Sequence, residues 1–480
     1  MSYYDYIIVG AGSAGCVLAN RLSADPDIRV CLLEAGGSNR SPLLHVPAGW
    51  AGTFKNPKYD WSFETEPEPE LDGRQVYWPR GKSLGGSSAI NGMIYVRGVP
   101  VDFAAWEQAG AKGWSWEDVL PYYKKAERQQ IHDDEMHGSD GPLHVQEVRD
   151  KRPMDDVFLN AMNQAGIPSN PDFNGVDQAG CGYYQFTQNN GRRWSTASAY
   201  LTPARSRTNL TIITHAITQR VLFDGTQATG VEISRRGRKQ TIQGAHVILS
   251  GGAVASPQLL EVSGVGDGER LRTLGIDVVH HAPDVGEHLQ DHILCKVVYA
   301  TQPEHSINRE VQGLRLIPAA LRWFFLREGP LTTGSAPVGA FCHTRDGLEA
   351  PDVQIHFASG GTLYNNAGKI RALKQPAVTA VVNQSRPESR GSIHAKSSDI
   401  ADAPVIAANY LSSALDRDTL LRGMRILLNI FDQSELQPYL NGRLSPDIET
   451  DLNDDEALMA YIRREASTVY HPTSTCSTGK

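Results

Sequence analysis

The sequence has few cysteines, no long apolar run and no block of like charge. Its six cysteines lie far apart among 480 residues and form no C-x-x-C pair, which argues against a zinc knuckle or a redox dithiol. No stretch reaches the ~18 uninterrupted apolar residues that a membrane span needs. The first five residues carry no basic segment, so we expect no signal peptide and a cytoplasmic protein with reduced, buried cysteines.

Charge and length limit the kinds of partner and the number of domains that the protein can have. The 54 acidic and 46 basic residues give a formal net charge of −8 without long runs of one sign, so we expect no nucleic-acid partner. Acidic substrates are not implied either. A chain of 480 residues exceeds one compact core, and this length suggests about three domain-sized units or two interleaved domains.

The most informative segment lies at the N-terminus. An apolar run ends in a G-x-G-x-x-G turn formed by Gly10, Gly12 and Gly15, and a small-residue helix follows. A second apolar run then ends on Glu34, about 20 residues beyond the glycines. In such a βαβ unit the glycines allow a tight turn and close backbone approach, the helix N-terminus attracts phosphate, and the acid binds a ribose. The segment therefore predicts a dinucleotide site.

Further along the chain, the pattern changes several times. A second segment rich in glycine and serine occupies residues 78–98 and predicts another contact with a phosphate or a flavin. Residues 102–130 and 411–431 have the apolar spacing of helices, and we expect the aromatic rings of the first of these segments to be core. Short strands are predicted between residues 209 and 250, with a hairpin at Asp224-Gly225.

Three motifs resemble the glucose–methanol–choline (GMC) oxidoreductase family of FAD enzymes. Residues 81–98 are similar to the first family signature, and residues 252–266 are similar to the second. Tyr470-His471-Pro472 resembles the segment that carries the catalytic histidine of the family. These motifs run in order over nearly the whole chain. Within the family, the chain looks most like bacterial alcohol, choline and L-sorbose dehydrogenases.

The resemblance implies an α/β fold class, α+β overall. A Rossmann-like FAD-binding domain is expected to be interleaved with a substrate domain built on an antiparallel sheet with helices. The expected FAD-binding domain comprises residues 1–44, 80–100, 206–292 and 462–480. The expected substrate-binding domain comprises residues 45–79, 101–205 and 293–461.

The resemblance also implies a set of cofactor-binding residues. They are Gly10, Gly12, Ser13, Ala14, Gly15, Glu34, Ala35, Gly85, Gly86, Ser88, Asn91, Gly92, Met93, Ile94 and Val221. Ile90 stands where some members carry a histidine bonded covalently to the flavin. Because isoleucine cannot form that bond, we expect noncovalent FAD.

The implied reaction is the oxidation of an alcohol to an aldehyde or ketone. His471 is the expected base, since a neutral imidazole accepts a proton near neutral pH. Flavin N5 takes the hydride, and the electrons pass to a quinone or another acceptor that is not oxygen. The alternatives are an oxidase that uses oxygen and, from another class, a lyase of the same fold or an inactive remnant.

Two other segments allow competing interpretations. His288 and His292 stand four residues apart and could lie on one helical face as metal ligands, but no third ligand is evident and we expect no metal. Residues 314–327 mix large apolar residues with three arginines. A helix packed over the substrate pocket is the favoured interpretation, and an interfacial helix with peripheral contact at the inner face of a membrane is the alternative.

The C-terminal segment departs from the family pattern. Nine residues follow His471, whereas the resemblance implies a further strand, a loop with a second active-site residue and a closing helix. We therefore expect a truncated or frameshifted family member that holds FAD weakly. The oligomeric state is not indicated.

Overall fold

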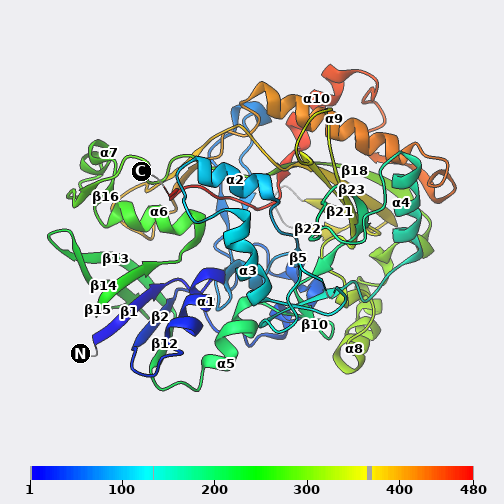
Figure 1. Cartoon of the computed structure of the whole chain (residues 1–480). Helices are drawn as coiled ribbons and strands as arrows, with labels where there is room; N and C mark the ends of the chain where they lie inside the picture. Colours follow the sequence, from blue (N-terminus) through cyan, green and yellow to red (C-terminus); the bar gives the residue numbers. More distant parts are fainter. Residues whose placement is uncertain (1–2, 133, 365–369, 479–480) are drawn as a thin grey trace.

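The computed structural model describes residues 3–132, 134–364 and 370–478 (Figure 1). Two large sheets organise these residues. The first has the strand order β12-β2-β1-β15-β14-β13, in which β12, β2, β1 and β15 are parallel and the hairpin predicted at Asp224 joins β13 to β14. Its strands are β1 (Tyr3–Val9), β2 (Val30–Glu34), β12 (Leu210–Thr214), β13 (Ala216–Asp224), β14 (Gln227–Arg235) and β15 (Arg238–Leu249).

Helices cover both faces of this first sheet. Alternate side chains of a strand point to opposite faces, so Ile8 packs in a cluster with α1 (Ser13–Leu22), whereas Ile7 packs in a second cluster with α6 (Gly252–Val262). Strands buried on both faces read as continuous apolar runs, which explains the composition of β1 and β2. The result is a doubly covered, largely parallel sheet.

The second sheet is antiparallel. Its strand order is β26-β18-β23-β20-β19-β8, and β27 also pairs with β18. Its strands are β8 (Gly180–Tyr183), β18 (Ile293–Thr301), β19 (Val338–Cys342), β20 (Val353–Ala358), β23 (Ala377–Gln384), β26 (Leu440–Ser445) and β27 (Ser467–Thr468). The two sheets together confirm the expected mixed α/β class.

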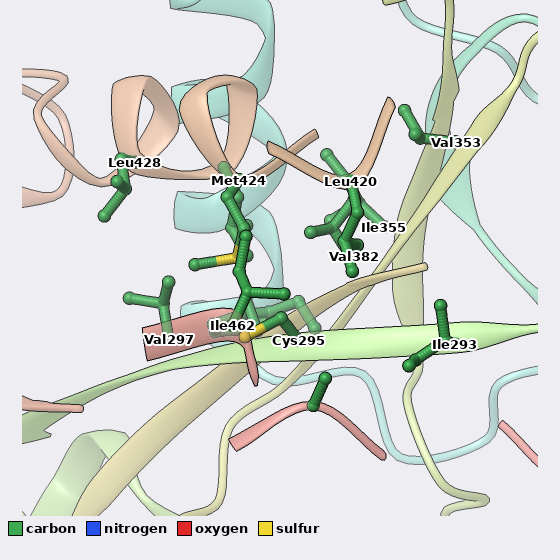
Figure 2. Packing of buried hydrophobic residues seen from close by; sticks show 14 of the residues in the cluster. Ile293, Cys295, Val297, Val353, Ile355, Val382, Leu420, Met424, Leu428 and Ile462 are labelled. Atoms are coloured by element: carbon green, nitrogen blue, oxygen red, sulfur yellow. The ribbon is translucent and has the colours of Figure 1, made fainter. Parts of the chain in front are cut away.

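One face of the antiparallel sheet carries the largest apolar core. The helices α4 (Pro153–Gln164), α9 (Ala414–Phe431) and α10 (Asp455–Glu465) pack on it. Figure 2 shows Leu420, Met424 and Leu428 of α9 above Cys295 and Val382 of the sheet. Because the helices occupy this face, the side chains at alternate strand positions are turned to the opposite face.

Smaller elements connect the two sheets. The remaining helices are α2 (Pro100–Gln108), α3 (Trp116–Ala126), α5 (Thr202–Ala204), α7 (Gly268–Thr273) and α8 (Leu316–Leu326). The remaining strands are β3 (Phe63–Glu64), β4 (Tyr77–Trp78), β5 (Ile94–Tyr95), β6 (Glu127–Gln129), β7 (Leu143–Glu147), β9 (Gln185–Phe186), β10 (Gln188–Asn189), β11 (Arg192–Arg193), β16 (Val265–Gly266), β17 (His280–His281), β21 (Thr362–Tyr364), β22 (Ile370–Ala372), β24 (Ser392–His394) and β25 (Val405–Ala407). No helix in the described ranges has the length and apolar character needed to cross a bilayer.

Two details differ from the sequence-based expectations. The expected domain boundary at residue 462 stays a prediction; residue 462 lies inside α10, and β27 beyond it pairs with the antiparallel sheet. The rings of residues 102–130 are not all core, since Trp106 is 50% and Tyr122 is 70% exposed. Cys476 is exposed, whereas the other five cysteines are buried as expected. Helical spacing predicts a helix but does not show which of its faces another element covers.

Candidate active site

A cavity of about 1150 Å³ opens at the carboxyl edge of the parallel sheet. Because β1, β2 and β15 are parallel, their carboxyl ends meet at one edge, and the residues that follow each strand line the cavity. In open α/β sheets this edge is the usual ligand site. Seven of the predicted cofactor-binding residues line it: Gly10, Gly12, Ser13, Ala14, Glu34, Ala35 and Gly86.

The three glycines of the first turn have different structural roles. Gly10 has φ +100°, and an added Cβ there would lie 2.5 Å from the Ser250 carbonyl oxygen. A Cβ on Gly15 would lie 1.9 Å from the Gly10 carbonyl oxygen, so the turn and α1 can approach only with glycine. A Cβ on Gly12 would meet Ser250 at an ordinary 3.9 Å. The fold itself therefore requires Gly10 and Gly15 but tolerates a methyl group at Gly12.

Glu34 ends β2 and borders the cavity. Its buried carboxylate accepts hydrogen bonds from the Ala11 N–H (2.9 Å) and the Gly36 N–H (2.8 Å). Burial raises the pKa of Glu34 to about 7, although both backbone hydrogen bonds act in the opposite direction. Gly12 begins α1 as its N-cap, and no side chain of the described residues caps this end. The N–H groups of the first turn therefore stay available to an anionic ligand.

The second glycine segment lies directly against the first. The Gly85 N–H donates to the Ala11 carbonyl (2.8 Å), and a Cβ on Gly86 would lie 2.6 Å from the Gly12 Cα. Gly85 and Gly86 both have positive φ, +98° and +52°, a backbone conformation that favours glycine. The two segments, whose contacting residues are 74 positions apart in sequence, thus form one wall.

The residues after Gly86 are held by a buried arginine. Arg193 donates from Nη1 to the Asn91 Oδ1 (2.7 Å) and to the Ser88 carbonyl (3.3 Å), while the Ser88 hydroxyl donates to the Gly85 carbonyl (2.6 Å). Arg193 is 1% exposed and has no carboxylate partner among the described residues, and burial lowers its pKa to about 9. An uncompensated buried cation here would favour negative charge on a bound ligand.

The other predicted cofactor residues do not line the cavity. Gly92 packs against Ser335, Met93 is buried with φ +69°, and Ile94 lies in β5. Ser88 and Asn91 are also outside the lining. Ile90 is buried in an apolar cluster.

Val221 lies outside the cavity lining, whereas the beginning of its strand, β13, belongs to it. Its N–H donates to the Ser263 hydroxyl (2.9 Å), and it does not line the cavity. Ala216, Ile217 and Thr218, earlier in β13, line it instead.

His471 follows β27 in a tightly fixed segment. Its N–H donates to the Asp291 Oδ1 (2.7 Å), and the buried Asp291 carboxylate also accepts from the hydroxyls of Tyr410 and Thr468. Mutual backbone hydrogen bonds between Thr473 and Gln290 hold the far end of the segment. Pro472 and Thr473 line the cavity, so His471 stands beside its wall.

The His471 ring has an unusual electrostatic environment. Protein crowds the ring although part of it remains exposed to solvent, and this desolvation holds its pKa well below the usual 6.5. His292, His356 and Arg80 lower the pKa further, because a second positive charge beside them is unfavourable. The ring is therefore neutral at physiological pH.

One nitrogen of the His471 ring contacts His292. The Nδ1 atoms of His471 and His292 lie 3.3 Å apart, and the tautomers of the two rings decide which atom donates and which accepts. A hydrogen bond to the Ser385 backbone also holds His292. His471 Nε2 has no hydrogen-bond partner among the described residues.

The third histidine comes from the antiparallel sheet. Val353, Ile355 and Phe357 of β20 pack in the core under the helices, so Gln354 and His356 point to the other face. Burial lowers the pKa of His356 to about 4. Neither ring nitrogen forms a well-aligned hydrogen bond within the described residues, although the Asn383 side chain lies near enough to oppose this shift.

A second buried polar group on this face also lacks a well-aligned hydrogen bond. Asn383 lies on β23, and its Oδ1 forms no well-aligned hydrogen bond within the described residues, although its side chain lies near the His356 ring. Unpartnered buried polar atoms are costly, which suits a face that meets a polar ligand.

Sequence reasoning did not find His356, Asn383 or Arg193. The available signal for the first was the polar pair Gln354 and His356 at alternate positions of an apolar strand. The other two depend on strand register and on long-range contacts that spacing does not show.

His288 and His292, the two histidines considered as metal ligands and not expected to hold a metal, do not lie on a helix. His288 has φ +62° in a loop and bonds to Asp284 (3.3 Å), while His292 faces His471. The absence of helical geometry removes the reason for pairing them. Elsewhere in the described part of the chain, ligand atoms of His132, Asp134 and Asp172 lie within 4.8 Å of one another, but His137 Nε2 already bonds to Asp172.

These features fit a bound dinucleotide. The cavity has the open helix N-terminus and the Gly12 position where backbone can approach a pyrophosphate. An acid at the end of β2 suits a ribose, and the unpartnered groups of the antiparallel sheet lie on the face turned away from the helices. A parallel-sheet dinucleotide cavity beside a neutral histidine fits an oxidoreductase that uses a dinucleotide cofactor.

The chain belongs to the GMC oxidoreductase family, whose N-terminal and C-terminal models match residues 4–294 and 387–480. The alcohol dehydrogenase [acceptor] of Pseudomonas putida is 42% identical over 99% of this chain and 86% of its own length. The mitochondrial choline dehydrogenase of Mus musculus is 40% identical over 99% of this chain and 80% of its own. The crystal structure of pyridoxine 4-oxidase from Mesorbium loti has a TM-score of 0.88 at 29% identity, covering 99% and 89% of the two chains.

The comparisons confirm the resemblance and the enzyme class, an oxidoreductase. They do not show the expected truncation.

Proposed function

We propose that the protein is an FAD-dependent dehydrogenase that oxidises an alcohol to an aldehyde or ketone. The neutral His471 ring, with Nε2 free beside the cavity wall, carries this proposal. Similarity to the alcohol and choline dehydrogenases supports a CH–OH donor. A quinone or another acceptor that is not oxygen is proposed to receive the electrons.

His471 supplies the acid–base part of the reaction. Its Nε2 accepts the hydroxyl proton of the alcohol, while the contact of Nδ1 with His292 keeps the ring oriented. The chemistry that FAD supplies when bound is acceptance of the hydride from the alcohol carbon. Asp291 positions the ring through the His471 backbone. His356 and Asn383 are proposed to orient polar groups of the substrate.

The proposed cofactor site is divided between the two glycine segments. Gly10, Gly12, Ser13, Ala14, Gly15, Glu34 and Ala35 would hold the adenosine and pyrophosphate part, and Gly85, Gly86, Ser88, Asn91, Gly92, Met93 and Ile94 would approach the pyrophosphate and the ring. Ala216 to Thr218 are the better candidates than Val221 for contact with the adenine, because they line the cavity. Ile90 supports noncovalent attachment of FAD, because isoleucine cannot bond to the flavin. We also propose that the protein has the interleaved two-domain division and that it is cytoplasmic.

Anaerobic mixing with a panel of alcohols tests this function. A dehydrogenase or an oxidase loses its yellow flavin absorbance, whereas a lyase or an inactive remnant does not. His471→Gln should slow flavin reduction roughly 10²- to 10⁴-fold, the usual contribution of a general base, without loss of bound flavin. His288→Gln, an exposed histidine of a nearby loop, is the matched control and should react as the wild type does. Reduction of the His471→Gln variant at the wild-type rate would remove His471 as the base.

An oxidase is the second candidate, favoured by the likeness to pyridoxine 4-oxidase. Admitting oxygen to the reduced enzyme separates the two candidates. Slow reoxidation by oxygen together with fast reoxidation by a quinone supports the dehydrogenase, and fast reoxidation by oxygen supports the oxidase.

A further inference from the structure

The helix α8 and the short turn Gly313–Arg315 just before it expose a row of large apolar side chains. Ile317, Leu321 and Phe324 stand at helical positions i, i+4 and i+7, so they share one face, and Leu314 and Phe325 extend it. We name these five residues the α8 ridge. Their exposed fractions are 84% for Leu314, 56% for Ile317, 52% for Leu321, 61% for Phe324 and 72% for Phe325.

The opposite face of α8 holds the helix to the protein. Ala319 and Trp323 are buried in a small cluster with Leu331, and the Trp323 indole N–H donates to the Gly191 carbonyl (2.8 Å). Figure 1 shows α8 at the periphery of the molecule, away from both large sheets. One apolar face of α8 is therefore packed against the protein, as the favoured sequence interpretation expects of a packed helix, and the other face is exposed.

A continuous row of exposed apolar side chains is unusual on a protein surface, whereas a single exposed apolar residue is common. Scattered apolar side chains are normal on protein surfaces, but a continuous exposed row marks a contact surface. All five ridge residues are large hydrophobic residues, and two are phenylalanines. The contact surface is thus strongly apolar at its centre.

Positive charge borders the ridge. Arg315 and Arg322 are exposed on the flanks of the helix, and Arg327 at its C-terminal end lies over the Trp323 ring, 4.3 Å from its centroid. Arg322 also forms an exposed ion pair with Glu328 (3.4 Å), a contact of little energetic weight in water. An apolar face with arginines beside it is typical of helices that lie in the interface of an anionic membrane.

We propose that the α8 ridge inserts into the surface of an anionic lipid bilayer and holds the protein there as a peripheral membrane protein. A protruding apolar ridge enters a bilayer without a preformed groove. Anionic headgroups would pair with Arg315 and Arg322, which a neutral apolar partner would not. This inference does not depend on the proposed reaction.

Vesicle sedimentation tests the proposal. The flavin-loaded wild-type protein should sediment with vesicles of phosphatidylcholine and phosphatidylglycerol, and more weakly with pure phosphatidylcholine. The double variant Phe324→Ser, Phe325→Ser should bind the anionic vesicles at least about tenfold more weakly, because apolar area that enters the bilayer is lost. Tyr122→Ser, at a 70% exposed aromatic residue of α3, is the matched control and should bind as the wild type does.

A charge variant and the oligomeric state complete the test. Arg315→Gln with Arg322→Gln should weaken binding to the anionic vesicles and leave binding to pure phosphatidylcholine unchanged, and added salt should act in the same direction. Absence of vesicle binding by the wild type, or equal binding by the phenylalanine variant, overturns the proposal. A wild-type dimer in size-exclusion chromatography that the phenylalanine variant converts to a monomer also overturns it, since the ridge would then be an interface between copies.

Discussion

At the scale of single residues, His356 makes the protein sensitive to acid. Burial lowers its pKa to about 4, so the unfolded chain binds a proton at this residue below pH 6.5 while the folded chain does not. Stability from this group is therefore complete above pH 6.5 and falls as the pH decreases toward 4. Between pH 7 and pH 5 the loss should be about 2 kcal/mol. We predict that His356→Gln, which cannot be protonated, loses that much less stability over this range in urea unfolding.

The control for this prediction is His288→Gln, at an exposed loop residue. Its change in stability between pH 7 and pH 5 should match the wild type. Equal acid sensitivity of the His356→Gln variant and the wild type would contradict the burial argument.

The pKa of His471 predicts the pH dependence of the reaction. Because desolvation by the surrounding protein and the neighbouring histidines hold this pKa well below 6.5, the base form predominates at and above pH 6.5. We expect kcat/KM for an alcohol to show no inflection near 6.5 and to fall only at lower pH, as the ring becomes protonated. A pH profile of anaerobic flavin reduction measures this. A loss of activity centred at pH 6.5 would show that the ring titrates as an ordinary histidine.

Only some of these residues could be predicted from the sequence. His471 was indicated because it lies in a short contiguous motif, and such motifs survive without knowledge of the fold. His356 and Asn383 lie on separate strands, and their shared face is set by the register between β20 and β23. His292 was considered as a metal ligand because a spacing of four suggests a helix, but the chain there passes through a left-handed residue, His288, instead.

At the scale of elements, the turn between β1 and α1 contains one glycine that the fold requires, Gly15, and one that we expect only the ligand to require, Gly12. Gly12→Ala should fold normally, because the added methyl group makes only an ordinary 3.9 Å contact with Ser250. It should nevertheless lose flavin, since the methyl group occupies the backbone approach expected of the pyrophosphate. We predict an unchanged melting temperature of the flavin-free protein and a much lower flavin content, both measured on purified protein.

Gly15→Ala is the matched comparison. Its Cβ would lie 1.9 Å from the Gly10 carbonyl oxygen, so this variant should be destabilised even without flavin. If Gly12→Ala retains flavin at the wild-type level, the dinucleotide does not approach this glycine.

The sequence predicted some helices and strands correctly but not which face of each helix is covered. The N-terminal βαβ unit and the helix α9 follow from apolar periodicity and glycine position, which are local properties. The exposed face of α8 could not be predicted, because residues 314–327 have apolar side chains on two opposite sides and sequence does not show which side is covered.

At the scale of the whole molecule, the cavity joins distant parts of the chain. Its lining comprises residues 9–10, 12–14, 33–35, 61–66, 75, 80–81, 86–87, 216–218, 249–256, 258–259, 396, 400–405 and 472–473. A ligand that contacts segments of such wide separation stabilises all of them together. We therefore predict that FAD raises the stability of one cooperative unfolding transition, by about 2.7 kcal/mol when its free concentration is 100 times its dissociation constant.

Thermal unfolding monitored by circular dichroism, with and without FAD, measures this effect. Gly12→Ala should show the same transition as the flavin-free wild type and no increase on addition of FAD. Two transitions of which FAD shifts only one would mean that the parallel sheet binds the dinucleotide alone. The antiparallel sheet, with His356, would then contribute substrate groups without sharing the stability gained from the cofactor, and the contacts of residues 472–473 with the cavity would be too weak to couple the two.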